Sequence, residues 1–230
     1  MAKKSKATHN KGQLITTANP KSPISEQYRT IRTSLEFKMV DQGINTFLVT
    51  SAEANAGKST TISNLAVTFA QRGKKVLLID ADLRKPFIHN CFKASNHVGL
   101  TNLLAQQLAF NEVAKGTLMA ENLTLITSGP IPPNPSELLG SMSMQRFIES
   151  ARSVFDIVLI DTPPVVAVTD AVILSSQVDG VVMVARAHQT KKEGLIKAKK
   201  LFEQVQANVL GVILHGGSAG DSAYYYYGDT

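Results

Sequence analysis

Residues 52–60, AEANAGKST, have the composition of a phosphate-binding loop. They lie between an apolar run at 46–51 and a segment with helical spacing. Such a loop binds phosphate through backbone N–H groups at a helix N-terminus, with a glycine for close approach, a lysine for the terminal phosphates and a hydroxyl for Mg²⁺. Gly57, Lys58 and Ser59 supply the last three. The predicted nucleotide-binding residues are Ala54, Asn55, Ala56, Gly57, Lys58, Ser59 and Thr60.

One position departs from the usual phosphate-loop pattern. A glycine ordinarily stands five places before the glycine that precedes the lysine, and here that position is Ala52. Asparagine tolerates a left-handed backbone better than most residues. We therefore expect Asn55 to make the turn that the missing glycine would have made.

Acidic residues follow two further apolar runs. KVLLID leads to Asp80 and Asp82, and DIVLID ends in Asp161. Ligands bind at the carboxyl ends of strands in an open parallel sheet, so these acids are expected beside the phosphate loop. Alone, Asp80 and Asp82 could equally solvate a strand end, but together with the phosphate loop they indicate a Mg-nucleotide site. The predicted metal ligands are Ser59, Asp80, Asp82 and Asp161, and the predicted catalytic residues are Lys58, Asp80, Asp82 and Asp161.

Apolar runs and helical patterns alternate along the chain, after an amphipathic helix predicted at 24–38. The predicted strands are 46–51, 75–80, 123–128, 156–161, 180–185 and 208–214. The predicted helices are 59–72, 99–108, 143–154, 169–177 and 190–206, with Ser136 as the N-cap of one more short helix. This alternation predicts an α/β fold with a doubly wound, mostly parallel sheet.

The chain has 230 residues and a net charge of +6, which suits one α/β domain. We predict a flexible basic N-terminus at 1–21, a P-loop domain at 22–218 and a flexible C-terminal tyrosine cluster at 219–230. The lysine-rich start and the lysines near 191–200 are interpreted as a disordered segment and a solvated helix face, so no nucleic-acid partner is expected. The single cysteine excludes a disulfide framework and a cysteine metal cluster, and no apolar run reaches the roughly 18 residues of a membrane span.

Four motifs together resemble those of a known family. They are DADLRKP at 80–86, SGPIPPNPSELLGS at 128–141, DTPP at 161–164 and the C-terminal tyrosines. They look like the bacterial tyrosine kinases, a branch of the deviant-Walker P-loop ATPases, and more specifically like the cytoplasmic kinases of Gram-positive capsule and exopolysaccharide operons. The resemblance covers the chain from about Ser22 to its end, and the combination of motifs is specific although no single motif is.

This resemblance implies a cytoplasmic protein-tyrosine autokinase that uses ATP and Mg²⁺. It implies transfer in trans within a ring-shaped homo-oligomer, activation by the intracellular tail of a membrane adaptor or polysaccharide co-polymerase, and a cognate phosphotyrosine phosphatase. The protein would then lie at the inner face of the plasma membrane through its adaptor and regulate the synthesis, chain length or export of capsular polysaccharide or exopolysaccharide. The implied phosphoacceptors are Tyr224, Tyr225, Tyr226 and Tyr227.

The resemblance also assigns roles to individual residues. Lys58 would hold the phosphates, Asp80 and Asp82 would be the Walker A′ acids, and Asp161 would be the Walker B acid. Asp80 would activate the tyrosine hydroxyl.

The family also uses a Glu-x-x-Arg-x-x-Arg helix in ring assembly, which Glu26, Arg29 and Arg32 match. These residues lie beside the face of helix 24–38 that is predicted to pack inward, and on spacing alone they would be an exposed charged stripe. His215 stands where related ATPases commonly have an asparagine that reads the base, and backbone groups at Gly216 and Gly217 could read it instead.

A second function fits most of the same features. A nucleotide-switch ATPase of the cell-division positioning or partition type assembles on a membrane or on DNA without phosphorylating a protein. The phosphate loop and the three acids fit this switch as well as they fit a kinase. The four adjacent tyrosines favour the kinase, because a tethered segment with several hydroxyls offers several phosphate acceptors.

Overall fold

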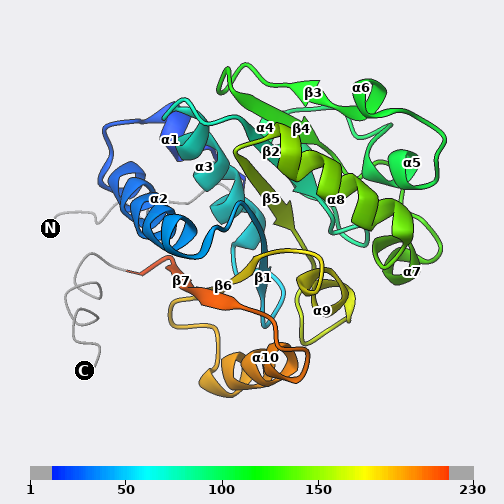
Figure 1. The fold of residues 1–230 in the computed structure, drawn as a ribbon. Coiled ribbons are helices and arrows are strands. Elements are labelled where there is room, and N and C mark those ends of the chain that lie inside the picture. The colour runs from blue at the N-terminus through cyan, green and yellow to red at the C-terminus, as the bar shows by residue number, and fades with distance from the viewer. Residues whose placement is uncertain (1–11, 218–230) are drawn as a thin grey trace, which may run out of the picture.

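The structure, a computed structural model, describes residues 12–217. Its centre is a seven-stranded sheet in the order β3-β4-β2-β5-β1-β6-β7, in which every neighbouring pair is parallel except β3 with β4 (Figure 1). The strands are β1 Thr46–Ser51, β2 Val76–Asp80, β3 Lys115–Gly116, β4 Leu123–Ile126, β5 Ile157–Asp161, β6 Gly180–Arg186 and β7 Val209–His215. The predicted doubly wound, mostly parallel α/β fold is confirmed.

Two helices of this part of the chain precede β1, and the others lie between successive strands. The helices are α1 Ile15–Ala18, α2 Pro23–Gln42, α3 Lys58–Ala70, α4 Ile88–Phe92, α5 Leu100–Leu104, α6 Phe110–Val113, α7 Pro135–Leu139, α8 Met142–Val154, α9 Asp170–Ser175 and α10 Lys192–Gln204. The elements absent from the sequence prediction are β3, α1, α4 and α6, which are all too short to show a hydrophobic period. Between residues 12 and 217, no helix is long and apolar enough to cross a lipid bilayer.

Successive residues of the central strands face opposite layers of helices. In β1, Phe47 and Val49 join one buried cluster with residues of α2 and α3, whereas Leu48 joins a second cluster with residues of α8, α9 and α10. All six residues of β1 are buried. The continuous apolar runs in the sequence therefore come from strands that are covered on both faces.

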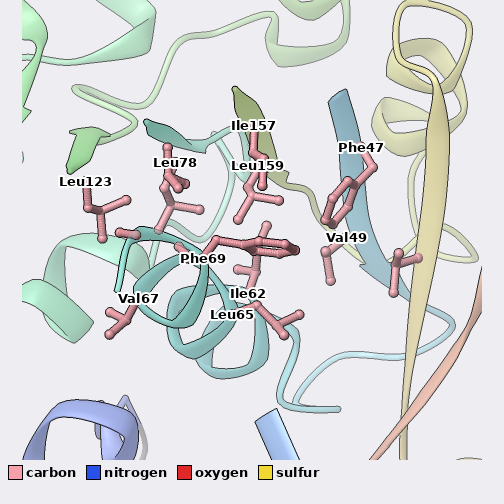
Figure 2. Packing of buried hydrophobic residues seen from close by; sticks show 14 of the residues in the cluster. Phe47, Val49, Ile62, Leu65, Val67, Phe69, Leu78, Leu123, Ile157 and Leu159 are labelled. Atoms are coloured by element: carbon pink, nitrogen blue, oxygen red, sulfur yellow. The ribbon is translucent and has the colours of Figure 1, made fainter. Parts of the chain in front are cut away.

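Helix α3 is the most deeply buried helix of the site. Its residues Ile62, Leu65 and Phe69 pack against apolar side chains of the central strands (Figure 2). Every residue of α3 except Thr60 is buried, because α1 and α2 cover the side that faces away from the sheet. The helix that follows the phosphate loop is thus fixed on all sides.

Helix α2 begins and ends at strong capping signals. Ser22 Oγ accepts a hydrogen bond from Ser25 N at 3.1 Å, and Pro23 occupies the first turn. The helix ends at Gly43, whose φ is +65°. It is therefore longer than the predicted 24–38. Its inner side includes Tyr28, as the spacing predicted.

The folded part of the chain begins before the predicted boundary at Ser22. We call Gly12–Ala18 the N-terminal strap; its Leu14 and Thr16 are buried. Thr16 donates from its N–H and its Oγ1 to Asn64 Oδ1 of α3, at 3.1 and 2.9 Å. The prediction of a flexible segment at residues 1–21 rested on the basic composition of the first eleven residues. The strap lies within the predicted segment, yet it packs on α3.

The buried hydroxyl of Tyr28 gives a test of this packing. Burial raises its pKa to about 12, against an opposing hydrogen bond with Thr61. A folded-state pKa above the unfolded value of about 10 adds stability that is present below pH ~10 and lost as the pH rises toward ~12. We expect the free energy of unfolding to fall by about 2–3 kcal/mol more in the parent protein than in Tyr28→Phe over this range. Urea denaturation of both proteins at a series of pH values measures it, and equal losses in the two would contradict it.

Candidate active site

The carboxyl ends of three neighbouring strands meet at one edge of the sheet. Strand β5 lies between β1 and β2, and Asp80 at the end of β2 is paired in register with Asp161 at the end of β5. Strand β1 ends at Ser51, and the chain continues through residues 52–57 into α3. The structure therefore brings the phosphate loop and the acidic residues together.

The phosphate loop has two residues in the left-handed region. The φ angles are +62° at Asn55 and +92° at Gly57. Asn55 thus makes the turn predicted for it, while Ala52 is buried in place of the usual glycine. Alternation of left-handed residues with others turns successive N–H groups toward a common point, which is how such loops bind anions. Ala54 is exposed and Thr60 is half-buried in the first turn of α3.

Lys58 and Ser59 point from the start of α3 into the acidic cluster. Lys58 Nζ lies 2.9 Å from Asp82 Oδ2 and 3.7 Å from Asp161 Oδ1. Ser59 Oγ donates to Asp161 Oδ2 at 2.5 Å. The ammonium and the hydroxyl that the sequence assigned to phosphate and metal are therefore already in contact with two of the three predicted acids.

The cluster carries more negative than positive charge. The three carboxylates of Asp80, Asp82 and Asp161 are offset by the one ammonium of Lys58, and all four residues are buried. Burial raises the pKa of Asp80 to about 8 and that of Asp161 to about 6, and Lys58 opposes both shifts. Asp161 Oδ1 has no hydrogen-bond partner. A divalent cation would supply both the positive charge and the partner that are missing, so these residues fit Mg²⁺.

The protein ligands at this edge do not enclose a metal by themselves. Within residues 12–217, no group of three or more His, Cys, Asp or Glu side chains is arranged to hold a metal ion. Mg²⁺ commonly takes only one or two carboxylates and completes its shell with substrate phosphates and water. The site therefore suits a Mg-nucleotide better than a free metal ion.

Asp80 is held differently from the other two acids. Its Oδ2 accepts hydrogen bonds from the N–H groups of Phe87 and Ile88 at 3.1 and 3.0 Å, and its Oδ1 accepts one from the N–H of Asp82 at 3.2 Å. These bonds tie the carboxylate to the loop between β2 and α4. Asp80 thus fixes that loop as well as contributing charge to the site.

His215 at the end of β7 lies against the phosphate loop. Its Nδ1 is 3.3 Å from Thr61 Oγ1 of α3. A Cβ atom added to Gly57 would lie 2.5 Å from His215 Cδ2, so the ring occupies the space beside this glycine. His215 was predicted near the nucleotide base, and it stands beside the loop that would hold the phosphates.

One residue of the site was missed at the sequence level. Arg186 at the end of β6 donates from Nη1 to the carbonyl oxygen of Asn55 at 3.0 Å. This bond holds Asn55 in the left-handed conformation with which it turns the loop. The signal available in the sequence was a cation at the carboxyl end of a predicted strand, the position where ligands of parallel sheets bind.

The three residues of the predicted assembly helix are not equally exposed. Glu26 and Arg29 form an ion pair on the surface of α2, and Arg29 Nη2 also donates to the carbonyl oxygen of Pro20 at 2.7 Å. Arg32 is 9% exposed and donates from Nη1 to the carbonyl oxygen of Thr68 in α3 at 3.1 Å. Arg32 therefore packs within its own chain, which the expectation of three residues beside the inward face did not foresee. The predicted phosphoacceptors, Tyr224 to Tyr227, lie outside the described residues.

The sequence matches the AAA domain family over residues 47–212. It is 45% identical over 227 residues to tyrosine-protein kinase YwqD of Bacillus subtilis (strain 168), covering 98% of this chain and 95% of that protein. It is 40% identical over 219 residues to tyrosine-protein kinase etk of Escherichia coli (strain K12), covering 93% of this chain and 29% of that much longer protein.

Solved structures agree with these sequence matches. The kinase domain of E. coli tyrosine kinase ETK superimposes with a TM-score of 0.84 at 34% identity, covering 94% of this chain and 84% of that one. The septum site-determining protein MinD from Pyrococcus horikoshii OT3, complexed with Mg-ADP, superimposes with a TM-score of 0.64 at 21% identity, covering 76% of this chain and 72% of that one. The second likeness shows the shared P-loop fold alone.

Gly57 offers a test of the phosphate loop. In Gly57→Ala the new Cβ would meet His215 and the backbone would keep a φ of +92°, so we expect nucleotide affinity to fall by roughly a hundredfold or more. Gly73 is the matched control, because its φ is +81° and no atom lies within 4 Å of the added Cβ. Gly73→Ala should lose about 1 kcal/mol of stability and keep its affinity. Titration with a fluorescent ATP analogue measures both, and an unchanged affinity in Gly57→Ala would contradict the assignment.

Arg186 offers a second test. Arg186→Ala removes the hydrogen bond to the Asn55 carbonyl, so we expect the dissociation constant for the ATP analogue to rise about three- to tenfold, as for the loss of one hydrogen bond. Arg146→Ala, at an exposed arginine of α8, should leave the affinity unchanged. Equal affinities in the two variants would show that Arg186 does not support the loop.

Proposed function

This chain belongs to the bacterial tyrosine-protein kinases of the AAA domain family, and we propose that it phosphorylates its own C-terminal tyrosines with Mg-ATP. The observation that carries the proposal is the buried cluster around Lys58, where the acids outnumber the cations and Asp161 Oδ1 lacks a hydrogen-bond partner. A Mg-nucleotide would supply the missing positive charge and a partner for Asp161 Oδ1. The proposed acceptors are Tyr224, Tyr225, Tyr226 and Tyr227.

The residues of the site divide the work of phosphoryl transfer. A bond forms between the tyrosine oxygen and the γ-phosphorus, the bond from that phosphorus to the bridging oxygen of ADP breaks, and the tyrosine proton passes to a base. Mg²⁺, when bound, neutralises charge on the phosphates. The backbone of residues 54–60 would hold the phosphates and Lys58 would offset the charge of the terminal one. Ser59, Asp82 and Asp161 would hold the metal or its waters.

Asp80 is the proposed acceptor of the tyrosine proton. A tyrosine hydroxyl has a pKa of about 10, so at neutral pH it needs a base as the new bond forms. Burial and the nearby Asp161 raise the pKa of Asp80 to about 8. Asp80 accepts a proton only as the carboxylate, and Lys58 and a bound Mg²⁺ would favour that form. Its Oδ1 accepts one backbone hydrogen bond, so a lone pair remains for the tyrosine.

The biological setting is proposed on the same resemblance. The chain would act at the inner face of the plasma membrane, bound to the intracellular tail of an adaptor or polysaccharide co-polymerase, and a cognate phosphatase would reverse its action. Its reaction would regulate capsular polysaccharide or exopolysaccharide synthesis. Exposed Glu26 and half-buried Arg29 are proposed to contact a neighbouring subunit in a ring.

Transfer between subunits can be tested by mixing a chain that has an inactive site with an active chain that lacks the acceptor tyrosines. A Lys58→Met chain keeps its tail tyrosines but lacks the ammonium of the site, and a second chain keeps the site with Tyr224 to Tyr227 changed to Phe. If transfer occurs in trans, we expect phosphotyrosine on the Lys58→Met chain only when the second chain and Mg-ATP are present. Mass spectrometry of differently tagged chains, with and without the adaptor tail, measures it.

The controls of this experiment separate three outcomes. The Lys58→Met chain alone should remain unphosphorylated. Phosphotyrosine in the parent protein but none on the Lys58→Met chain in the mixture would show transfer within one chain. ATP hydrolysis without phosphotyrosine in any mixture would instead favour the nucleotide switch.

A further inference from the structure

A polar network lies beside the acidic cluster and joins three segments of the chain. Arg84 donates from Nε to Asp170 Oδ2 at 2.8 Å and from Nη2 to Asp170 Oδ1 at 2.9 Å. The same Nη2 donates to Ser136 Oγ at 2.8 Å, and Ser136 Oγ donates to Asp170 Oδ1 at 2.7 Å. Asp170 is fully buried, whereas the side chain of Arg84 is 36% exposed. Two parallel hydrogen bonds of this kind fix orientation as well as charge.

The three members come from segments that follow three neighbouring strands. Arg84 lies in residues 81–87 between β2 and α4, which we call the A′ loop. Ser136 lies in α7 after β4, and Asp170 begins α9 after β5. Ser136 was predicted as the N-cap of its helix, but Asn134 stands at that position and the Ser136 hydroxyl is turned to Asp170 instead. The network therefore holds the A′ loop to the chain that follows Asp161.

The other side of the A′ loop holds the acids of the site. Lys85, next to Arg84, donates its N–H to Asp82 Oδ1 at 3.0 Å. The N–H groups of Phe87 and Ile88 hold Asp80 Oδ2. Arg84 thus lies between Asp82 and the donors that orient both carboxylates. A shift of Arg84 would move these donors with it.

Packing of α7 on α9 does not depend on Arg84. Gln177 donates from Nε2 to the carbonyl oxygen of Leu139 at 3.1 Å, next to the end of α9. A Cβ added to Gly140 would lie 3.3 Å from Ile173, so the two helices are also in close apolar contact. The contribution specific to Arg84 and Asp170 is therefore the position of the A′ loop.

We propose that Asp170, acting through Arg84 with Ser136, is a positioning residue that fixes the A′ loop and so sets the orientation of Asp80 and Asp82 in the Mg-nucleotide site. The inference rests on the proposed function for its chemistry. Its structural part, the order of the A′ loop, can be measured without catalysis. Asp170 does not contact Lys58 or Ser59 in this arrangement; its effect passes through the loop.

The experiment compares two aspartates in similar ion pairs. Asp170→Asn weakens the pair with Arg84. Asp179→Asn weakens the pair of Asp179 with Arg152, whose side chain is also 36% exposed. This second pair lies beside the start of β1, at the end of the strands opposite to the site. Amide hydrogen exchange at Lys85, Phe87 and Ile88 is measured by NMR in both variants. The Mg²⁺ concentration needed for half-maximal binding of a fluorescent ATP analogue is measured alongside.

In Asp170→Asn we expect exchange of these three amides to speed up about tenfold or more, and the half-saturating Mg²⁺ concentration to rise about tenfold. Asp179→Asn should change neither the amide exchange nor the half-saturating Mg²⁺ concentration, even if it lowers the melting temperature as much as Asp170→Asn does. Arg84→Lys keeps the charge but loses the paired hydrogen bonds, so it should behave like Asp170→Asn, and the double variant should add little to either. If Asp170→Asn does not fold, Arg84→Lys decides the question.

Two outcomes would overturn the inference. One is unchanged exchange and unchanged Mg²⁺ dependence in a folded Asp170→Asn or Arg84→Lys protein. The other is an equal change in Asp179→Asn, which would indicate general loss of stability. A parent protein that forms no phosphotyrosine would defeat the proposed function, yet the exchange and binding measurements would still decide on the network.

Discussion

The placement of three buried carboxylates against one lysine is the constraint on which the rest of this structure depends. Buried charges are costly unless they are paired and hydrogen-bonded. Asp82 is paired with Lys58, Asp161 accepts a hydrogen bond from Ser59, and Asp80 accepts hydrogen bonds from backbone N–H groups of the A′ loop. Lys58 and Ser59 come from α3, and α3 is held by the sheet on one side and by α1 and α2 on the other. Much of the fold is therefore arranged around this charge cluster.

The parts of the structure that follow from local sequence could be predicted. Strands such as β1 and β5 are buried on both faces, so they appear as unbroken apolar runs whose ends are easy to locate. The turn of the phosphate loop could also be predicted, because few residues other than glycine accept a left-handed backbone and Asn55 is one of them. The candidate site could thus be assembled from strand ends alone.

The remaining features depend on contacts that no local pattern reports. Arg84 and Asp170 are 86 residues apart in the chain, and only the adjacency of β2 and β5 brings them together. Arg32 follows a charged spacing typical of an exposed face, yet its guanidinium reaches a carbonyl of α3. The strap and the shortest helices have too few residues for a hydrophobic period to emerge. In each case tertiary packing overrides the local signal.

The strap on α3 also has a mechanical consequence. The Asn64 side chain accepts two hydrogen bonds from Thr16 and donates to the carbonyl oxygens of Gln13 and Thr60. One amide group therefore connects the incoming polypeptide to the first turns of the helix that starts at the phosphate loop. Tension applied at Gly12 would therefore reach that helix through these hydrogen bonds. An engineered fusion joined at Gly12 would therefore act on the nucleotide site through Asn64, whereas a fusion joined at Ser22 would lack this connection.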